Sequence, residues 1–392
     1  MRQSFYLAYK YIGFHKTRSL VLVFSIGLIV FLPNGLKKLI NESETLMILR
    51  AKSTPLIVGA KGNSTDLVIN TLYFQQEKTD NITVGIMEKI NETAFGYAIP
   101  ILSMFSARNF PIIGTDPDYF SFRSLTLEKG RFMSFVGECV IGSSVAAKLN
   151  IGINDSLVSS PENFFDLAGI YPLKMNVVGV LNQSDTPDDQ AVFVDIKTNW
   201  VILGLGHGHE DLTNNYDPTI VIKRDSNEVK AGAKLFLYNT IDGNNMDSFH
   251  FHGDMSSYPV SSLIFIPKDH KSETIFRGRF ESGDFQQQVI VPEEVVNNLL
   301  QSIFRIKKIF NTVFVLVGIA TFLILALIIT LSVRLRKNEI YTMFTIGSSK
   351  GKVVEIIVFE LIILIGSSAM VASVLYLMTG LFVDDFIHNF II

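Results

Sequence analysis

The chain has 392 residues and a formal net charge of −3, which gives no indication of the basic surface that nucleic-acid binding requires. Apolar residues make up 48% of the sequence and mean hydropathy is +0.33, but the excess is concentrated in three segments. The single cysteine, Cys139, excludes an intrachain disulfide and any metal site built on a cysteine pair. The length allows a sizeable folded domain beside a membrane part.

The first segment combines a basic lead-in with an apolar run. Residues 1–18 alternate basic and aromatic side chains, a pattern that favours a position at an anionic cytoplasmic surface. Residues 19–36 carry no charge and predict transmembrane helix 1. No small-residue cleavage site of the Ala-x-Ala type follows, which argues against a signal peptide. Residues 37–50 continue as an amphipathic stalk helix that leaves the membrane.

Residues 51–290 form a large polar region between the first and second apolar segments. Short β-rich runs bounded by turn residues predict strands, with helical runs at 80–91 and 225–238 between them. This alternation indicates an α+β domain, which we expect to contain two subdomains. The predicted strands are 55–59, 98–102, 110–114, 139–142, 175–181, 191–195, 218–223 and 261–266.

The last third of the chain predicts two further spans. Residues 291–308 form a second stalk helix, with Pro292 in its first turn, and the apolar run 309–333 predicts transmembrane helix 2. Residues 353–383 predict transmembrane helix 3, and an acidic tail, 384–392, follows it. The fold class expected is therefore a membrane protein with three transmembrane α-helices and a large α+β extracytoplasmic domain on a helical stalk.

The loop at 334–352 sets the orientation. It carries five basic residues in 19 positions and joins two predicted spans, so the positive-inside rule places it in the cytoplasm. The N-terminus is then inside, and the domain at 51–290 and the tail are outside. The loop has helical periodicity of its own. A faint likeness to a nucleotide-binding loop at 347–352 has the wrong spacing and follows a span rather than a strand, so we do not expect nucleotide there.

Two His-x-His pairs stand out in the outer region. They comprise four of the seven histidines: His207 and His209, followed by two acidic residues, and His250 and His252. In an extended segment, residues two apart share a face, so each pair is able to present two imidazoles to one transition-metal ion. Local hydrogen bonding by histidines in two polar loops is the explanation we favour, because a zinc site also requires a geometry that sequence does not show, and the metal site stays open as a hypothesis.

The order of motifs along the chain resembles permease subunits of the MacB/FtsX type of ABC transporter, also called mechanotransmission permeases. The loop Arg334-Leu-Arg-Lys-Asn-Glu-Ile-Tyr-Thr-Met-Phe-Thr-Ile-Gly-Ser-Ser-Lys-Gly-Lys-Val353 is similar to the cytoplasmic motif of that family. In the outer region, Gly114-Thr-Asp-Pro-Asp-Tyr-Phe120, Gly130-Arg-Phe132, Gly142-Ser-Ser-Val-Ala146 and Asp189-Gln-Ala-Val-Phe-Val-Asp195 are similar to the family's periplasmic domain. The resemblance covers almost the whole chain.

The resemblance implies a bacterial inner-membrane protein that is not itself an enzyme. A separate ABC ATPase would bind ATP and magnesium, two permease copies would form a dimer, and a periplasmic adaptor or a lipoprotein is a further expected partner besides membrane lipid. The loop would receive the motion of the ATPase. Its coupling residues would be Arg336, Lys337, Glu339, Ile340, Met343, Gly347, Ser348 and Lys352.

Two carboxylates lie within the third predicted span, and the number of predicted spans differs from that of the family. Glu355 and Glu360 lie in the first turns of the third span, where we expect them to anchor the cytoplasmic end rather than relay protons. Family members usually have four spans, whereas three are predicted here, and a fourth supplied by another chain is one explanation.

Two functions remain open on this basis. The first is export or extraction of a lipophilic or peptide-like substrate; the alternative is an FtsX-like signal transmitter that regulates an outer partner, with a metal link through the histidines. A membrane-bound hydrolase is disfavoured, because the chain has no Gly-x-Ser-x-Gly elbow.

Overall fold

The computed structural model describes residues 2–76, 79–160, 172–208, 221–225, 228–231, 239–241, 249–283 and 285–390. The chain divides into two compact units. The helical unit comprises Met1–Thr45 and Leu299–Ile391, and the sheet unit comprises Leu46–Asn298. Each unit is described by itself below.

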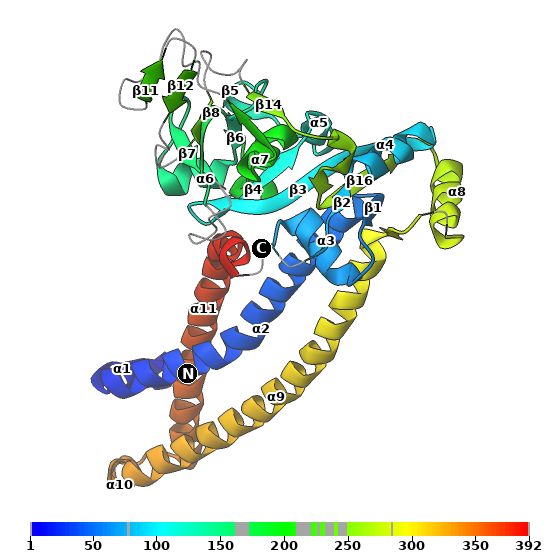
Figure 1. Ribbon diagram of the computed structural model, residues 1–392. Helices are drawn as coiled ribbons and strands as arrows, with labels where there is room; N and C mark the ends of the chain where they lie inside the picture. The colour runs from blue at the N-terminus through cyan, green and yellow to red at the C-terminus, as the bar shows by residue number, and fades with distance from the viewer. Residues whose placement is uncertain are drawn as a thin grey trace. The chain divides into compact units, whose positions relative to one another are not determined.

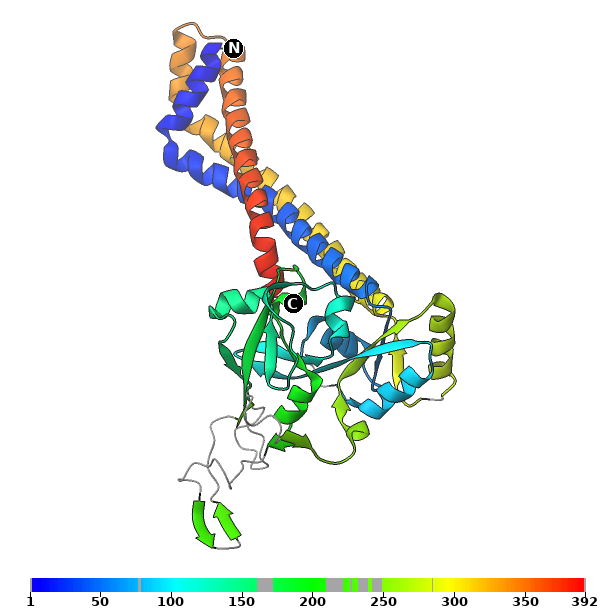
Figure 2. The ribbon, with the colours of Figure 1, turned by 90° about the horizontal axis from the view of Figure 1, so that it is seen from above.

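The helical unit is built from the two ends of the chain. Its elements are α1 (Arg2–Phe14), most of α2 (Lys16–Lys52), most of α9 (Pro292–Leu335), α10 (Lys337–Thr345) and α11 (Lys350–Phe390). In Figure 1, α10 occupies the turn between α9 and α11. Helix α1 packs on α11, with the rings of Phe5 and Phe359 5.7 Å apart, and Figure 2 shows the two helices side by side.

Helices near both ends are able to span a membrane. Lys16–Lys52 and Lys350–Thr379 are long and apolar enough, whereas the described part of α9 has a shorter apolar stretch, Phe310–Ile324. The apolar side chains of these helices are largely exposed, as expected for surfaces that contact lipid. Two spanning candidates are thus supported by length and composition, and the count of three stays a prediction.

The sheet unit is organised by one mixed sheet of eleven strands. Its order is β13-β8-β6-β9-β4-β3-β16-β1-β17, with β5 and β7 also paired to β8. The pairs β13/β8, β4/β9 and β6/β8 are parallel and the others are antiparallel. The strands are β1 (Leu56–Gly59), β3 (Gly96–Ala107), β4 (Phe110–Thr115), β5 (Leu127–Gly130), β6 (Glu138–Ile141), β7 (Ser156–Val158), β8 (Leu173–Leu181), β9 (Val192–Asp195), β13 (Asn239–Thr240), β16 (Ser262–Pro267) and β17 (Gln288–Ile290).

Smaller elements surround this sheet. Three two-stranded ladders pair β2 (Ile82–Thr83) with β15 (Pro259–Val260), β10 (Gly206–Gly208) with β14 (Phe249–Phe251), and β11 (Val221–Asp225) with β12 (Glu228–Ala231). The helices are α3 (Ser64–Tyr73), α4 (Val84–Glu92), α5 (Asp118–Phe122), α6 (Ser143–Leu149), α7 (Ile196–Ile202) and α8 (His270–Glu281), with short 3₁₀ turns η1 (Pro187–Gln190) and η3 (Met255–Ser257).

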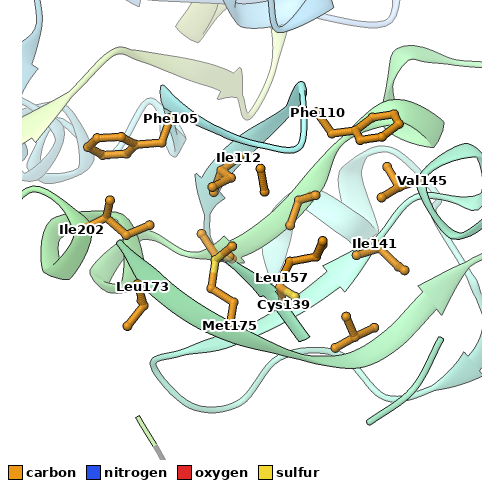
Figure 3. Close-up of a cluster of buried hydrophobic side chains, with 14 of the residues drawn as sticks. Phe105, Phe110, Ile112, Cys139, Ile141, Val145, Leu157, Leu173, Met175 and Ile202 are labelled. Atoms are coloured by element: carbon orange, nitrogen blue, oxygen red, sulfur yellow. The ribbon is translucent and has the colours of Figure 1, made fainter. Parts of the chain in front are cut away.

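Both faces of the large sheet are buried, because successive side chains of a strand point to opposite faces. In β9, Val192 and Val194 enter one hydrophobic cluster while Phe193 enters another. The strand β16 divides in the same way, with Phe265 on one side and Ile264 on the other. Figure 3 shows part of the first cluster, where side chains such as Cys139 and Met175 gather from neighbouring strands. The apolar runs of the sequence are therefore core strands.

Each of the eight predicted strands overlaps an observed strand, and one predicted helix is wrong. The helix predicted at 225–238 is contradicted by the β11/β12 ladder, in which Arg224 is paired with Val229. The sequence Asp-Ser-Asn at 225–227, whose last two residues lie outside the described part of the chain, is of a type that favours turns over helices. The division of the domain into two subdomains stays a prediction.

Candidate functional site

The predicted coupling segment, residues 334–352 of the helical unit, is organised around the guanidinium of Arg336, which lies directly before α10. This side chain is buried, at 9% exposure. Its Nη1 donates to Glu360 Oε2 at 2.9 Å, and its guanidinium carbon lies 3.5 Å from the ring centroid of Tyr11. The guanidinium of Arg336, directly before α10, therefore contacts α1 through Tyr11 and α11 through Glu360. A movement of α10 would change both contacts.

The other predicted coupling residues divide into an inner and an outer set. Ile340 and Met343 are half-buried and line the same pocket as Arg336 and Tyr11. Glu339 is mostly exposed, at 60%, and accepts a long hydrogen bond of 3.4 Å from Arg336 Nε. Lys337 is exposed. Lys352 lies in the first turn of α11, where its Nζ is 2.8 Å from Glu355 Oε2.

Gly347 ends α10 in a backbone conformation that favours glycine. Its φ is +92°, in the left-handed region. The Gly347 N–H donates to Phe344 O at 3.0 Å, and the Ser348 N–H donates to Met343 O at 2.9 Å. This pair of hydrogen bonds defines a Schellman motif, which closes the C-terminal carbonyls of a helix and fixes the direction of the following chain. Gly347 and Ser348 therefore set how α10 connects to α11.

Two apolar side chains on the outer side of this segment are left uncovered. Tyr341 is 69% exposed and Ile346 is 79% exposed, whereas Ile340, the residue directly before Tyr341, lines the pocket. The two exposed side chains are therefore candidates for contact with a partner protein. The sequence periodicity selected Ile340 and Met343 and missed these two residues.

In the sheet unit, the end of α2 is held by a buried ion pair that the sequence did not predict. Arg50, in the last turn of the helix, is bidentate to Asp188 in η1, with Nη1–Oδ2 at 2.6 Å and Nη2–Oδ1 at 3.1 Å. Arg50 Nε donates to the carbonyl oxygen of Leu72 at 2.7 Å. The hydroxyl of Tyr119 donates to Asp188 Oδ1 at 2.6 Å and accepts from Arg50 Nη2 at 3.0 Å.

The electrostatics of this cluster favour its charged form. Burial alone would raise the pKa of Asp188, but the Arg50 charge and the hydrogen bonds lower it to about 2. Burial disfavours the charge of Arg50, and Asp188 nevertheless raises the pKa of that guanidinium. The pKa of Tyr119 is raised, first by burial and then by Asp188. Ionised Arg50 and Asp188 with a neutral Tyr119 hydroxyl form one closed network.

A second arginine fixes the turn that follows α2. Arg123 Nη1 donates to Ser53 Oγ at 3.0 Å, and Nη2 donates to Thr54 Oγ1 at 2.9 Å. Its guanidinium carbon also lies 4.6 Å from the ring centroid of Phe122. At the start of α9, Glu293 pairs with Lys52 at 3.5 Å, which links the ends of the two predicted stalk helices within the sheet unit. These contacts tie the end of α2 to the sheet unit and to the start of α9.

The structure brings parts of the two His-x-His pairs together. In the β10/β14 ladder, the backbone of His207 is directly opposite that of His250, and the rings of His250 and His252 lie 4.5 Å apart. The side chain of His207 and the whole of His209 lie outside the described residues. Among the described side chains, no group of three or more metal-ligating residues is assembled. The metal site thus stays a prediction.

Comparison with known proteins identifies the class. The family model described as the MacB-like periplasmic core domain matches residues 21–234, more than half of the chain. None of the curated proteins matches it. Among solved structures, the periplasmic region of MacB from Actinobacillus actinomycetemcomitans matches at 9% identity and a TM-score of 0.38, covering 64% of this chain and 97% of that one. The extracellular domain of the noncanonic ABC-type transporter YknZ from Gram-positive bacteria matches at 9% identity and a TM-score of 0.33, and the match covers 60% of this chain and 98% of that one. A permease domain from Porphyromonas gingivalis matches at 10% identity and a TM-score of 0.26, and the match covers 60% of this chain and 86% of that one.

The chain is an ABC-transporter permease component of the MacB/FtsX type. More particularly, it belongs to the family defined by the MacB-like periplasmic core domain, which includes most of the sheet unit. With helices near both ends that could span a membrane, it is an inner-membrane protein with an extracytoplasmic domain. The sheet unit is that domain.

Proposed function

We propose that this permease converts ATP-driven motion of a separate ATPase subunit into movement of its sheet unit, for export or extraction of a lipophilic or peptide-like substrate. The observation that carries the proposal is the construction of α10. Tyr341 and Ile346 are exposed on its outer side, while Arg336 is buried against Tyr11 and Glu360 on its inner side. An ATPase that docks on the outer side would act directly on a cation that contacts both α1 and α11.

The loop that contains α10 lies on the cytoplasmic side in this proposal, because its basic residues follow the positive-inside rule. Glu355 and Glu360 then lie in the first turns of α11, close to the cytoplasmic surface, and each accepts a hydrogen bond from a nearby cation. Paired charges at this depth support an anchoring role. The substrate would be handled on the outer side and would not pass between the helices.

In this proposal, the sheet unit is the part of the chain that is moved. The end of α2 is fixed to it by Arg50–Asp188, and the start of α9 is linked to α2 by Lys52–Glu293. A helix end held by a bidentate buried ion pair resists slippage, so displacement of α2 would be passed on to the sheet. A second permease copy would provide the partner against which the sheet unit moves. In the FtsX-like alternative, the ATPase would act on the chain in the same way, but movement of the sheet unit would control an outer partner protein.

The experiment is capture of a candidate ATPase by the full chain in detergent. Replacing Tyr341→Ser and Ile346→Ser together is expected to weaken capture by about tenfold or more, because exposed aromatic and aliphatic anchors dominate interface energies. Met255→Ser is the matched control, since Met255 is a comparably exposed apolar side chain in the sheet unit, at 49%. Equal capture by the double variant and the control would overturn the proposed docking surface.

A further inference from the structure

A groove of about 650 Å³ runs between α2 and α11 in the helical unit, away from the coupling segment. The two helices approach each other closely beside it. A Cβ atom placed on Gly27 would lie 3.1 Å from Val371 Cγ1 and 3.2 Å from Ser368 O. The volume is in the range of sites that hold small molecules. The groove is therefore large enough to accommodate part of a lipid.

The lining of the groove changes from apolar to polar along both helices. On α2, Val30 and Phe31 come first, and Asn34, Lys37, Lys38 and Asn41 follow. On α11, the small side chains of Ala369, Ala372 and Ser373 precede Tyr376 and Leu377. Both helices begin on the basic, cytoplasmic side in the proposed orientation, so the polar end lies toward the outer membrane surface, where tyrosine and lysine are typical of the interface. The pattern is that of a site for an amphiphile.

The side chains at the polar end of the groove carry a net positive charge. Lys38 Nζ is 3.8 Å from Glu42 Oε1 and lies 5.1 Å from the ring centroid of Tyr376. Lys37 is exposed, and within the part of the chain that the structure describes it forms no ion pair. Lys38 is thus only weakly paired with a carboxylate, and Lys37 adds a second positive charge beside it. A phosphate group placed there would gain a charge-assisted hydrogen bond from each lysine.

We propose that this groove binds an anionic lipid from the outer half of the membrane. The phosphate of the headgroup lies at Lys37 and Lys38, and an acyl chain lies along Phe31 and Ala372. The small side chains of α11 leave room for the chain, and the two lysines select for a net negative headgroup. This inference rests on the proposed function, because the orientation of the helices defines which half of the membrane supplies the lipid. It names an anionic lipid as the class of substrate or regulator.

The test is lipid retention by the full chain, measured by native mass spectrometry after release from detergent. Phosphatidylglycerol, zwitterionic phosphatidylcholine and inorganic phosphate are the three probes. We expect phosphatidylglycerol to bind more tightly than phosphatidylcholine by roughly 30-fold, because each lysine near an anionic headgroup adds about a factor of five. Inorganic phosphate, which lacks the chain, is expected to compete only weakly.

Two variants separate the headgroup from the chain. Lys37→Gln with Lys38→Gln is expected to abolish the preference for phosphatidylglycerol, and Ala372→Phe is expected to reduce binding of both lipids by filling the apolar part. Lys10→Gln with Lys16→Gln removes the same charge at the other end of the unit and serves as the control. Loss of the preference in this control, or its persistence in the Lys37/Lys38 variant, would overturn the site.

The outcome is distinguishable from failure of the proposed function. Lipid binding is measured without an ATPase, and ATPase capture is measured without the lipid probes. Capture with no lipid preference would refute the groove alone, whereas a lipid preference with no capture would leave the groove standing and refute the coupling.

Discussion

Arg50 and Asp188 are 138 positions apart in the sequence, yet their side chains are bidentate partners in the interior of the sheet unit, with exposed fractions of 6% and 1%. The pair joins the last turn of α2 to the short turn η1, and Tyr119 completes it. Because desolvation offsets much of the attraction, such a pair adds little net stability, but removal of one partner leaves a buried charge unpaired. The Arg50–Asp188 pair therefore determines the position in the sheet unit at which the end of α2 is held.

Replacement of Asp188 by Asn should destabilise the sheet unit by about 3–5 kcal/mol, because the buried Arg50 charge loses its counter-ion. Trp200 is the single tryptophan and is buried in this unit, so its fluorescence reports unfolding of the full chain in urea. The pKa of Asp188 is lowered from 3.8 to about 2, so this stabilisation is present above pH 3.8 and is lost as the pH falls toward 2.

Glu128→Gln is the matched control for this variant. Glu128 pairs with Lys129 at the surface, where the two side chains are 49% and 69% exposed, and exposed ion pairs contribute little to stability. The urea midpoint of the control should be close to that of the parent chain. An Asp188→Asn midpoint equal to that of the control would contradict the anchoring role.

Asp116 should give the opposite pH dependence. Burial, followed by the charge of Asp118, raises its pKa from 3.8 to about 6. The folded state therefore holds a proton that the unfolded state has released, and the associated stability is lost as the pH rises through 6. Asp116→Asn should match the parent at pH 4 and exceed it at pH 8 by on the order of 1 kcal/mol, after allowance for solvent screening. A constant difference at both pH values would exclude this titration.

Gly347→Ala should uncouple α10 from α11. An alanine at φ +92° is strained by roughly 1 kcal/mol, so the Schellman motif is weakened and α10 changes direction. With a captured ATPase, we expect reduced stimulation of ATP turnover, and Glu339→Gln should act in the same direction by loosening Arg336. Gly351→Ala is the control, since a Cβ there meets only Ser349 Oγ, at 4.0 Å. Unchanged turnover with Gly347→Ala and Glu339→Gln would refute the coupling role.

We retain the transition-metal site as a proposal with a direct test. The opposition of His207 and His250 in the β10/β14 ladder is the observation in its favour. Calorimetric titration of the full chain with Zn²⁺ should give micromolar binding that disappears in His250→Ala with His252→Ala. His270→Ala removes an exposed histidine elsewhere, at 92%, and should bind as the parent does. Absence of heat with the parent chain would dismiss the site.

The sequence predicted the elements whose signal is local. Apolar runs bounded by turn residues marked core strands such as β9, and periodicity marked the helix at α10. The Arg50–Asp188 pair was missed because it depends on contacts across 138 positions, although an arginine at the end of a helix directly before an apolar strand is a signal worth following. Tyr341 and Ile346 were missed because periodicity selects the packed side of a helix and leaves the docking side unmarked. The helix predicted at 225–238 was wrong because helical propensity does not account for the pairing of β11 with β12.

The central claim is that ATP binding by a partner moves the sheet unit. Pulsed electron paramagnetic resonance on the assembled transporter measures this directly, with a spin label at Lys197→Cys, an exposed position after β9, in a Cys139→Ser background. The distance between the labels of two permease copies should change when a non-hydrolysable ATP analogue is added, and the change should be lost with Gly347→Ala. A distance distribution unaffected by nucleotide, in an assembly whose ATPase is active, would contradict the account.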